Sequence, residues 1–288
     1  MARSKKENNT LTTNHREHTA MRNFTDKVAV ITGAGSGIGR ALAIALATEG
    51  ARLAISDIDD RSLRETGQLL PPGTEVRSYH LDVTSQAAVF AHAEAVRADF
   101  GGVHLLINNA GSALLGSFEH QSLDEMQWLI DLDLWSVIYC TKAFLPIMLS
   151  QREGCIVNMS SIAGLMGMPA LSSYNIAKFA VRGMTESLWS ELEGTGVRAM
   201  CIHPGGIRTN IDRASRRCAT AGEMEARMDA VNKRTLRTPP ERCAADILKG
   251  IRRGKRRVVT GYRASSVDWL ARLLPDAYPA LFAKVFGF

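Results

Sequence analysis

The sequence alternates short β-branched runs with longer amphipathic segments from residue 27 onward, and this alternation constrains the fold more than any other feature. The short runs are largely apolar, as expected of strands buried on both faces of a parallel sheet. They cover Val28–Thr32, Arg52–Asp57, Glu75–Asp82, His104–Asn109, Cys155–Ser160, Arg198–His203 and Arg257–Thr260. Helical spacing covers Gly39–Thr48, Gln86–Phe100, Leu123–Leu149 and Ser173–Glu193. We therefore predict an α/β fold with one doubly wound parallel sheet of about seven strands, flanked by helices.

The chain has 288 residues, which is enough for one or two domains, and the repeated alternation indicates one. Residues 1–22 are polar without apolar periodicity, so we predict a disordered tail there. The folded domain is predicted over residues 23–262. Residues 263–288 are rich in apolar and aromatic side chains and are predicted to form an extension packed on or beside that domain. Ser85 and Ser122 are predicted to cap two of the helices.

The charge and the cysteines limit the classes of partner and compartment. The formal net charge of +6 is local, because residues 208–257 hold 15 Lys and Arg against 6 Asp and Glu. Without interleaved aromatic residues or a nucleic-acid motif, the run Arg252–Arg257 is interpreted as an exposed loop, and no nucleic-acid partner is predicted. The five cysteines are scattered without a C-x-x-C pair, so we predict no metal site and a reducing cytoplasm. No apolar run is long enough to predict a membrane span.

A glycine-rich turn, T-G-A-G-S-G-I-G from Thr32 to Gly39, lies between the first predicted strand and the first helix. Glycines let the backbone turn tightly and approach a pyrophosphate, whose charge is met by free N–H groups at the positive end of the helix dipole. The alternative is an ordinary strand-to-helix turn. The residues predicted to bind a dinucleotide here are Gly33, Ser36, Gly37, Ile38 and Gly39.

Asp57 ends the second predicted strand, 24 residues after Gly33. A carboxylate at this position can accept hydrogen bonds from the adenosine ribose and repel a 2′-phosphate. NAD is therefore the favoured cofactor. NADP is the alternative, because Arg40 or Arg61 could reach a 2′-phosphate. Without a dinucleotide, Asp57 could instead cap the following helix.

Tyr174 and Lys178 are four residues apart in a predicted helix, so their side chains share one face. A phenol is a poor base at neutral pH, and a neighbouring ammonium group lowers the pKa of the phenol towards the working range. Ser161 follows the fifth predicted strand, where its hydroxyl can bind a substrate oxygen that gains or loses charge. These three side chains predict acid–base chemistry at a substrate oxygen.

These motifs, together with N-N-A-G at 108–111 and P-G-G-I-R-T at 204–209, resemble the short-chain dehydrogenase/reductase family over about residues 27–261. The resemblance implies a Rossmann-type fold and an NAD(P)-dependent oxidoreductase that interconverts a secondary alcohol and a ketone. It implies that Ser161, Tyr174 and Lys178 are catalytic, and that the last two also contact the cofactor. The remaining cofactor-binding residues that it implies are Asp82, Val83, Asn108, Ala110, Gly111, Pro204, Ile207 and Thr209.

Asp133, a further candidate catalytic residue, departs from the resemblance, because the family usually has Asn there. In the family this Asn lies on a locally irregular helix, where a backbone carbonyl holds a water of a proton relay. Any substitution keeps the carbonyl, but an ionised Asp cannot donate as an amide does. Either Asp133 is protonated or paired differently and the relay works, or turnover is impaired. The first interpretation is favoured, and it predicts that Asp133→Asn keeps or raises the rate.

The resemblance also implies a homodimer or homotetramer and a lid at about residues 210–237. We expect a small-to-medium, fairly apolar alcohol or ketone as substrate. Met224 and Met228 either face that substrate or pack the lid helix. The extension at 263–288 has three open uses. Packing on the core or a subunit interface is favoured over walling the substrate pocket and over peripheral contact with a membrane. The alternative to an enzyme is a dinucleotide-binding regulator or scaffold that has lost catalysis.

Overall fold

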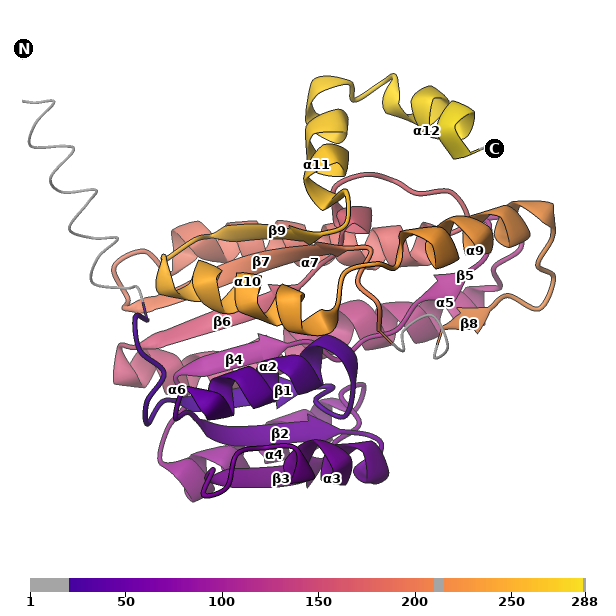
Figure 1. Cartoon of the computed structure of the whole chain (residues 1–288). Coiled ribbons are helices and arrows are strands. Elements are labelled where there is room, and N and C mark those ends of the chain that lie inside the picture. The colour runs from indigo at the N-terminus through magenta and orange to yellow at the C-terminus, as the bar shows by residue number, and fades with distance from the viewer. Residues whose placement is uncertain (1–20, 210–214, 287–288) are drawn as a thin grey trace, which may run out of the picture.

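The computed structural model describes residues 21–209 and 215–286, and a seven-stranded parallel sheet forms its centre (Figure 1). The strand order is β3-β2-β1-β4-β6-β7-β9. The strands are β1 (Val28–Thr32), β2 (Arg52–Asp57), β3 (Val76–His80), β4 (Leu105–Asn108), β6 (Gly154–Met159), β7 (Val197–Gly205) and β9 (Arg257–Gly261). The chain adds β2 and β3 on one side of β1, and the connection after β3 then crosses back to place β4 on the other side of β1. This reversal confirms the predicted doubly wound sheet. A separate pair joins β5 (Leu114–Leu115) to β8 (Arg216–Arg217).

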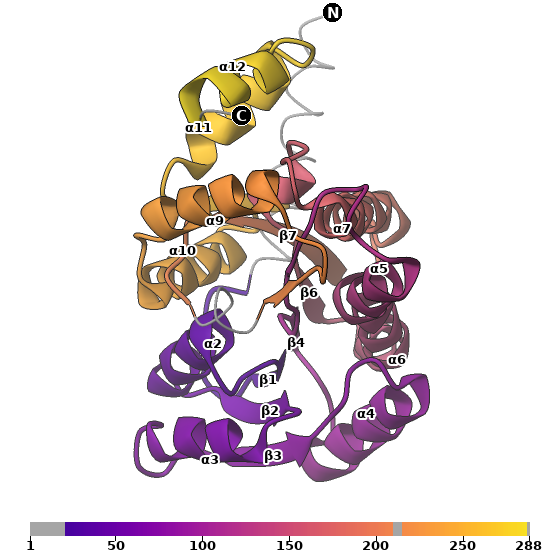
Figure 2. The same cartoon turned by 90° about the vertical axis from the view of Figure 1, so that its right-hand side faces the viewer.

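Helices cover both faces of the sheet, as the view in Figure 2 shows. One face carries α2 (Gly37–Thr48), α3 (Asp60–Gln68) and α10 (Pro240–Arg252). The opposite face carries α4 (Gln86–Phe100), α5 (Leu123–Ile130), α6 (Ser136–Gln151) and α7 (Ser172–Glu191). The Ser85 and Ser122 hydroxyls accept hydrogen bonds from the backbone N–H groups three residues later, at the starts of α4 and α5. Both predicted caps are confirmed.

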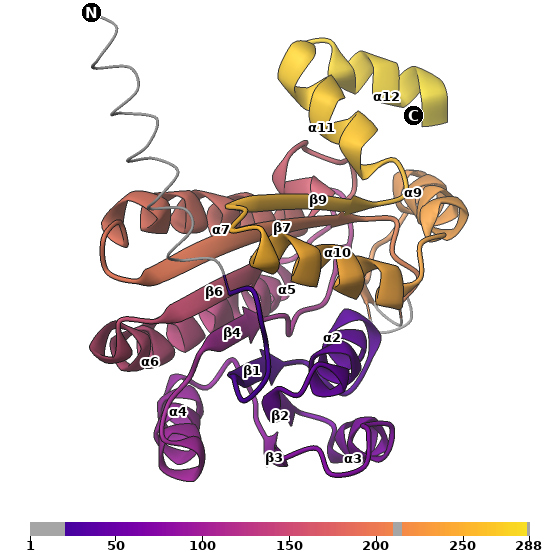
Figure 3. The same ribbon diagram turned by 60° about the vertical axis from the view of Figure 1, so that its left-hand side comes forward.

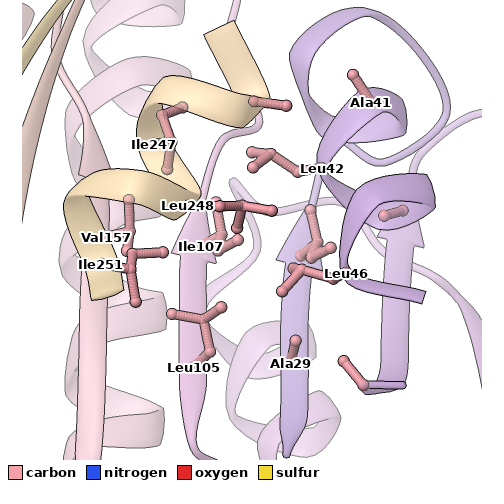
Figure 4. Close-up of a cluster of buried hydrophobic side chains, with 14 of the residues drawn as sticks. Ala29, Ala41, Leu42, Leu46, Leu105, Ile107, Val157, Ile247, Leu248 and Ile251 are labelled. Carbon is pink, nitrogen blue, oxygen red and sulfur yellow. The ribbon is translucent and has the colours of Figure 1, made fainter. Parts of the chain in front are cut away.

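The core is divided by the sheet into two large apolar clusters. In one of them, side chains of α2 and α10 meet over the central strands, and Figure 4 shows Leu42 and Leu46 facing Ile247 and Leu248. Each such fully buried side chain contributes about 1.5–3 kcal/mol to the free energy of unfolding. Met21 is buried in the same cluster. The predicted end of the tail at residue 22 is therefore too late, and residues 1–20 lie outside the described residues.

The strand β3 differs from the expectation of burial on both faces. It lies at the edge of the sheet and leaves Arg77, Ser78 and His80 exposed to solvent. Charged side chains on an edge strand discourage pairing with another chain. The mixed sequence of this strand therefore reflects its edge position.

The predicted helix 123–149 is a continuous helix of three parts: α5, a π-helical turn (Asp131–Trp135) and α6. By length and composition, the whole stretch Leu123–Gln151 could cross a membrane. In this fold it lies on the sheet, where it packs against α4, α7, β4 and β6. The π turn carries Asp133, whose side chain is fully buried. Single π turns occur mostly at functional sites, because the extra residue re-aims nearby side chains.

A buried histidine predicts that the fold is acid-sensitive. The His92 ring lies between the rings of Tyr79 and Phe144, at centroid distances of 4.6 and 5.7 Å. Neither of its ring nitrogens has a hydrogen-bond partner among the described residues, and burial lowers the pKa of His92 to about 4. The His92 ring of the unfolded chain takes up a proton below pH ~6.5, whereas the buried ring stays neutral down to a pH of about 4. The contribution of His92 to the free energy of unfolding is therefore complete above pH ~6.5 and is lost as the pH falls to about 4.

We expect the loss to be about 3 kcal/mol for this one residue. Urea unfolding of the parent protein and of His92→Leu at pH 7 and at pH 4 measures it. The variant should lose about 3 kcal/mol less than the parent on acidification. Equal losses in the two proteins would show that His92 does not carry the effect.

Candidate active site

One cavity of about 810 Å³ lies at the carboxyl ends of the central strands. Those strand ends face the viewer in Figure 2. The cavity is lined by all the predicted site residues except Gly39 and Asn108. Residues that are up to 176 positions apart in the sequence, from Gly33 to Thr209, thus meet in one place. This convergence is what a parallel sheet produces, because its strands all end at the same edge.

The glycine turn after β1 is shaped for a close backbone approach. Gly33 has a φ of +64°, and a Cβ there would lie 2.7 Å from the Ala110 Cα. A Cβ on Gly39 would lie 2.2 Å from the Gly33 carbonyl oxygen. Ser36 is the N-cap of α2, but its side chain makes no capping hydrogen bond. The first N–H groups of α2 are therefore available to an anion in the cavity, and the turn fits the pyrophosphate of a dinucleotide.

Asp57 ends β2 and lines the cavity in a fixed position. Its carboxylate accepts hydrogen bonds from the backbone N–H groups of Gly35, at 2.8 Å, and Asp59, at 3.0 Å. It does not cap the next helix, because Asp59 is the N-cap of α3. The carboxylate lines the cavity where the ribose of a dinucleotide would reach it.

Arg40, which could reach a 2′-phosphate by its sequence position, is engaged within the protein. Its guanidinium donates hydrogen bonds to the carbonyl oxygens of Gly35 and Ser62 and to the Thr66 hydroxyl, and it pairs with Glu65 at 3.2 Å. These bonds hold the glycine turn against α3. Arg61 stays outside, with its side chain 84% exposed and paired with Glu65 at 3.4 Å. Neither arginine lines the cavity.

Asn108 is the clearest correction among the predicted cofactor contacts. Its side-chain amide donates to Thr141 and Asn158, at 3.1 and 2.8 Å, and it is buried between β4 and the neighbouring elements instead of lining the cavity. Asn109 lines the cavity instead, and its amide donates to the carbonyl oxygens of Thr32 and Gly33. Successive side chains alternate along a strand, so the interval N-N-A-G alone does not decide which asparagine faces the site.

Ser161 follows β6 and faces Tyr174 of α7. Its hydroxyl oxygen accepts a hydrogen bond from the Ala163 N–H at 3.1 Å, and the Ser161 side chain acts to lower the pKa of Tyr174. Beneath Ser161, the His203 Nδ1 donates to the Ser161 carbonyl at 3.0 Å. Burial lowers the pKa of His203 to about 4, so this ring is neutral and supports the backbone. The Ser161 hydroxyl is therefore held in place with its proton free to donate.

The charge environment of Tyr174 differs from the sequence expectation. Enclosure raises the pKa of Tyr174 above its ordinary value, although the Lys178 charge and the Ser161 side chain act in the opposite direction. The Lys178 Nζ lies 5.5 Å from the centroid of the Tyr174 ring. Lys178 lowers this pKa, as expected, but burial and the carboxylate of Asp133 act against it and the pKa is raised.

Lys178 and Asp133 form a buried ion pair. The Lys178 Nζ lies 2.9 Å from the Asp133 Oδ2 and donates to the Met159 carbonyl at 3.1 Å. The Asp133 Oδ1 accepts the Ser112 N–H at 2.8 Å. A Cβ on Gly111 would lie 2.9 Å from that oxygen, so glycine at this position makes room for the carboxylate. Asp133, the residue that departs from the family resemblance, is thus paired with Lys178, a predicted catalytic residue.

The other half of the cavity is apolar, and sequence reasoning missed most of it. The lining residues come from the loop 165–171, from α9 (Glu223–Thr235), from α11 (Ala264–Leu273) and from α12 (Tyr278–Phe286). They include Met166, Met168, Leu171, Met228, Val231, Val267, Leu270, Leu281 and Phe282. Of the two lid methionines, Met228 lines the cavity and is buried, whereas Met224 is exposed. Residues 210–214 of the predicted lid lie outside the described residues.

The carboxyl-terminal extension packs on the domain and also walls the cavity, a use that the sequence favoured less. Figures 1 and 3 show α11 rising from the end of β9 and α12 turning back over the same side of the molecule. Phe282 packs in an apolar cluster with Met168 and Tyr174, and the Tyr278 hydroxyl accepts a hydrogen bond from the Gly167 N–H at 3.3 Å. The apolar composition of residues 263–288 was the signal, but composition does not say which surface is covered.

Comparison with known proteins agrees with this geometry. Residues 27–219 match the sequence model of the family described as short chain dehydrogenase. The SadH protein of Mycobacterium tuberculosis is 44% identical over 91% of this chain and 96% of its own length. A 3-alpha-(or 20-beta)-hydroxysteroid dehydrogenase of the same organism is 38% identical over 64% of this chain and 70% of its own length. A short-chain dehydrogenase/reductase from Burkholderia phymatum, solved in complex with NAD, superposes with a TM-score of 0.81, at 32% identity and covering 91% of this chain and 97% of that one.

Proposed function

Since this chain belongs to the short-chain dehydrogenase family of NAD(P)-dependent oxidoreductases, we propose that it interconverts a secondary alcohol and a ketone on an apolar substrate. One observation carries the proposal: Ser161, Tyr174 and Lys178 lie together in a cavity that joins the glycine turn to an apolar compartment. A cofactor in one half of that cavity and a substrate in the other would meet at these three side chains.

Each of the three side chains has a part in the proposed reaction. When bound, the nicotinamide supplies or accepts the hydride. Tyr174 exchanges the proton with the substrate oxygen, acting as an acid in reduction and as a base in oxidation. Ser161 donates its hydroxyl proton to the same oxygen and stabilises the charge that develops there. Lys178 uses two of its three protons on Asp133 and Met159, which leaves one for a ribose hydroxyl of the cofactor.

The apolar walls support a substrate with a hydrocarbon body. Only the oxygen at the reacting carbon would then need polar partners, which Ser161 and Tyr174 supply. The similarity to a hydroxysteroid dehydrogenase supports the same class. The test is the absorbance of the reduced nicotinamide during incubation with hydroxysteroids, secondary fatty alcohols and short polar alcohols. Turnover of apolar secondary alcohols supports the proposal. Cofactor binding without turnover of any alcohol or ketone would instead support the catalytically silent regulator.

We propose NAD as the preferred cofactor, on the fixed carboxylate of Asp57 and the internal bonding of Arg40. In Asp57→Ala, NADH should lose the hydrogen bonds to its ribose, and NADPH should no longer be repelled. We expect the ratio of the two affinities to change by about tenfold or more in favour of NADPH, measured by fluorescence titration. Asp59→Ala is the matched control, because it removes a neighbouring carboxylate that does not line the cavity. If Asp57→Ala kept the parental ratio of NADH to NADPH affinity, the role assigned to Asp57 in selecting NAD would be contradicted.

We also propose a cytoplasmic homodimer or homotetramer. The helices on one face expose large apolar side chains, Trp135 of the π turn and Ile176 and Phe179 of α7, which a second copy could cover. All five cysteines are free and buried, as suits a reducing compartment. Sedimentation equilibrium tests the assembly, and a monomer at micromolar concentration would contradict it.

A further inference from the structure

The Asp133–Lys178 pair is completely enclosed. The two side chains are 0% and 6% exposed, and their charged atoms are 2.9 Å apart. An ionised group in such a place is stable only when another charge and hydrogen bonds replace its water. The Ser112 N–H provides the second bond for Asp133, and the Met159 carbonyl provides it for Lys178. The Asp133 carboxylate therefore stabilises the charge of Lys178, and the π turn places that carboxylate beside the lysine.

The pair changes the field that Tyr174 experiences. A lone ammonium beside the phenol favours the phenolate, because the opposite charges attract. A carboxylate 2.9 Å from that ammonium turns the single positive charge into a short dipole, whose field falls off faster with distance. The negative end disfavours the phenolate, so Asp133 opposes what Lys178 does to Tyr174.

We propose that Asp133 is a positioning residue that offsets the Lys178 charge at Tyr174 and so keeps the phenol protonated at neutral pH. The proposal rests on the proposed function and adds to it the pH range in which reduction or oxidation proceeds. A protonated Tyr174 is the form that donates a proton to a ketone, so reduction proceeds at neutral pH. Oxidation of the alcohol needs the phenolate and proceeds at alkaline pH.

The other titratable side chains around this centre come from β7, α7 and α11. On β7, burial raises the pKa of the Cys201 thiol to about 12, and burial lowers the pKa of His203 to about 4. On α7, Arg182 and Glu186 pair with each other at 2.7 Å. On α11, Arg263 lines the cavity mouth, exposed and with its guanidinium over the ring of Tyr262.

The carboxylates Asp57 and Asp82 lie in the same cavity, at its cofactor end. Asp57 ends β2 and Asp82 follows β3, at the β3 edge of the sheet, whereas α7, which carries Tyr174, packs against β6 and β7. Lys178 and Asp133 are the charged groups that act on the pKa of Tyr174. Removing the charge of Asp133 therefore tests the pair itself.

The test is an ultraviolet titration of the Tyr174 phenolate in the protein without cofactor. Subtracting the titration of Tyr174→Phe removes the other four tyrosines. We expect Asp133→Asn to lower the titration midpoint of Tyr174 by about one pH unit or more. The acid limb of kcat/KM for oxidation should shift in the same direction, so the rate of oxidation at neutral pH should rise.

Asp131→Asn is the matched control. It removes a carboxylate from the same π turn, but Asp131 bonds to Gln127 at 2.8 Å, away from Lys178. The titration of Tyr174 should not move in this variant. An unchanged or raised midpoint in Asp133→Asn would overturn the proposal. If Asp133→Asn does not fold, Asp133→Ser carries the same expectation and the same refutation. The titration needs no substrate, so a failure to oxidise any alcohol would contradict the proposed function alone.

Discussion

Tyr174→Phe is expected to lower kcat/KM for the proposed reaction by about 10²–10⁴-fold, because the variant removes the group that exchanges the proton with the substrate oxygen. The ring and its packing against Met168 and Phe282 are kept, so the cavity retains its shape. The affinity for NADH should change by less than about tenfold. Steady-state kinetics on the most active alcohol, with a fluorescence titration of NADH, measures both quantities.

Tyr139→Phe is the control for this loss. Tyr139 lies on α6 and stacks on Trp135 at a centroid distance of 5.7 Å, outside the cavity. Removing its hydroxyl should leave kcat/KM within about twofold of the parent value. If Tyr174→Phe kept near-parental activity, another group would have to be the acid–base, and the proposed mechanism would fail.

Gly39→Ala is expected to disrupt the cofactor half of the cavity. The added methyl group would lie 2.2 Å from the Gly33 carbonyl oxygen and 2.6 Å from the Asn109 side-chain amide. The carbonyl belongs to the backbone and cannot rotate away, so α2 has to move relative to the turn. We expect the affinity for NADH to fall by about 100-fold or more, and the free energy of unfolding to fall by about 1–3 kcal/mol.

Gly67→Ala is a sharp control, because Gly67 lies in the neighbouring helix α3 and a methyl group there would meet nothing within 4 Å. It should raise the free energy of unfolding by about 0.5–1 kcal/mol and leave NADH binding unchanged. Fluorescence titration and urea unfolding of both variants make the comparison. Parental NADH affinity in Gly39→Ala would show that the turn does not cradle the cofactor.

The parts of the fold that were predicted correctly depend on short-range pattern. The strands β1 and β2 have the predicted bounds, because their apolar runs are uninterrupted and end at turn residues. The helix α4 also has the predicted bounds, since Ser85 caps its start and Gly101 ends it in the left-handed conformation. The helix α3 was missed, because its nine residues are mostly polar and bury only Leu63 and Thr66.

The corrections in the site have a different origin. The internal bonding of Arg40, the burial of Asn108 and the wall formed by Phe282 each depend on residues that are 22 or more positions away. The sequence marked Asp133 as unusual, but only the fold shows that its partner is Lys178. The raised pKa of Tyr174 likewise comes first from burial, which only the fold creates, with the Asp133 carboxylate acting in the same direction.

The sequence by itself determined the doubly wound sheet, the glycine turn and the three side chains proposed to react, because periodicity, glycine and short fixed intervals act locally. The tertiary structure decided which charges meet, which asparagine faces the cavity and what encloses the substrate. Hydrogen bonds and ion pairs act over a few ångströms in space, and the sequence does not state which distant residues lie within that range.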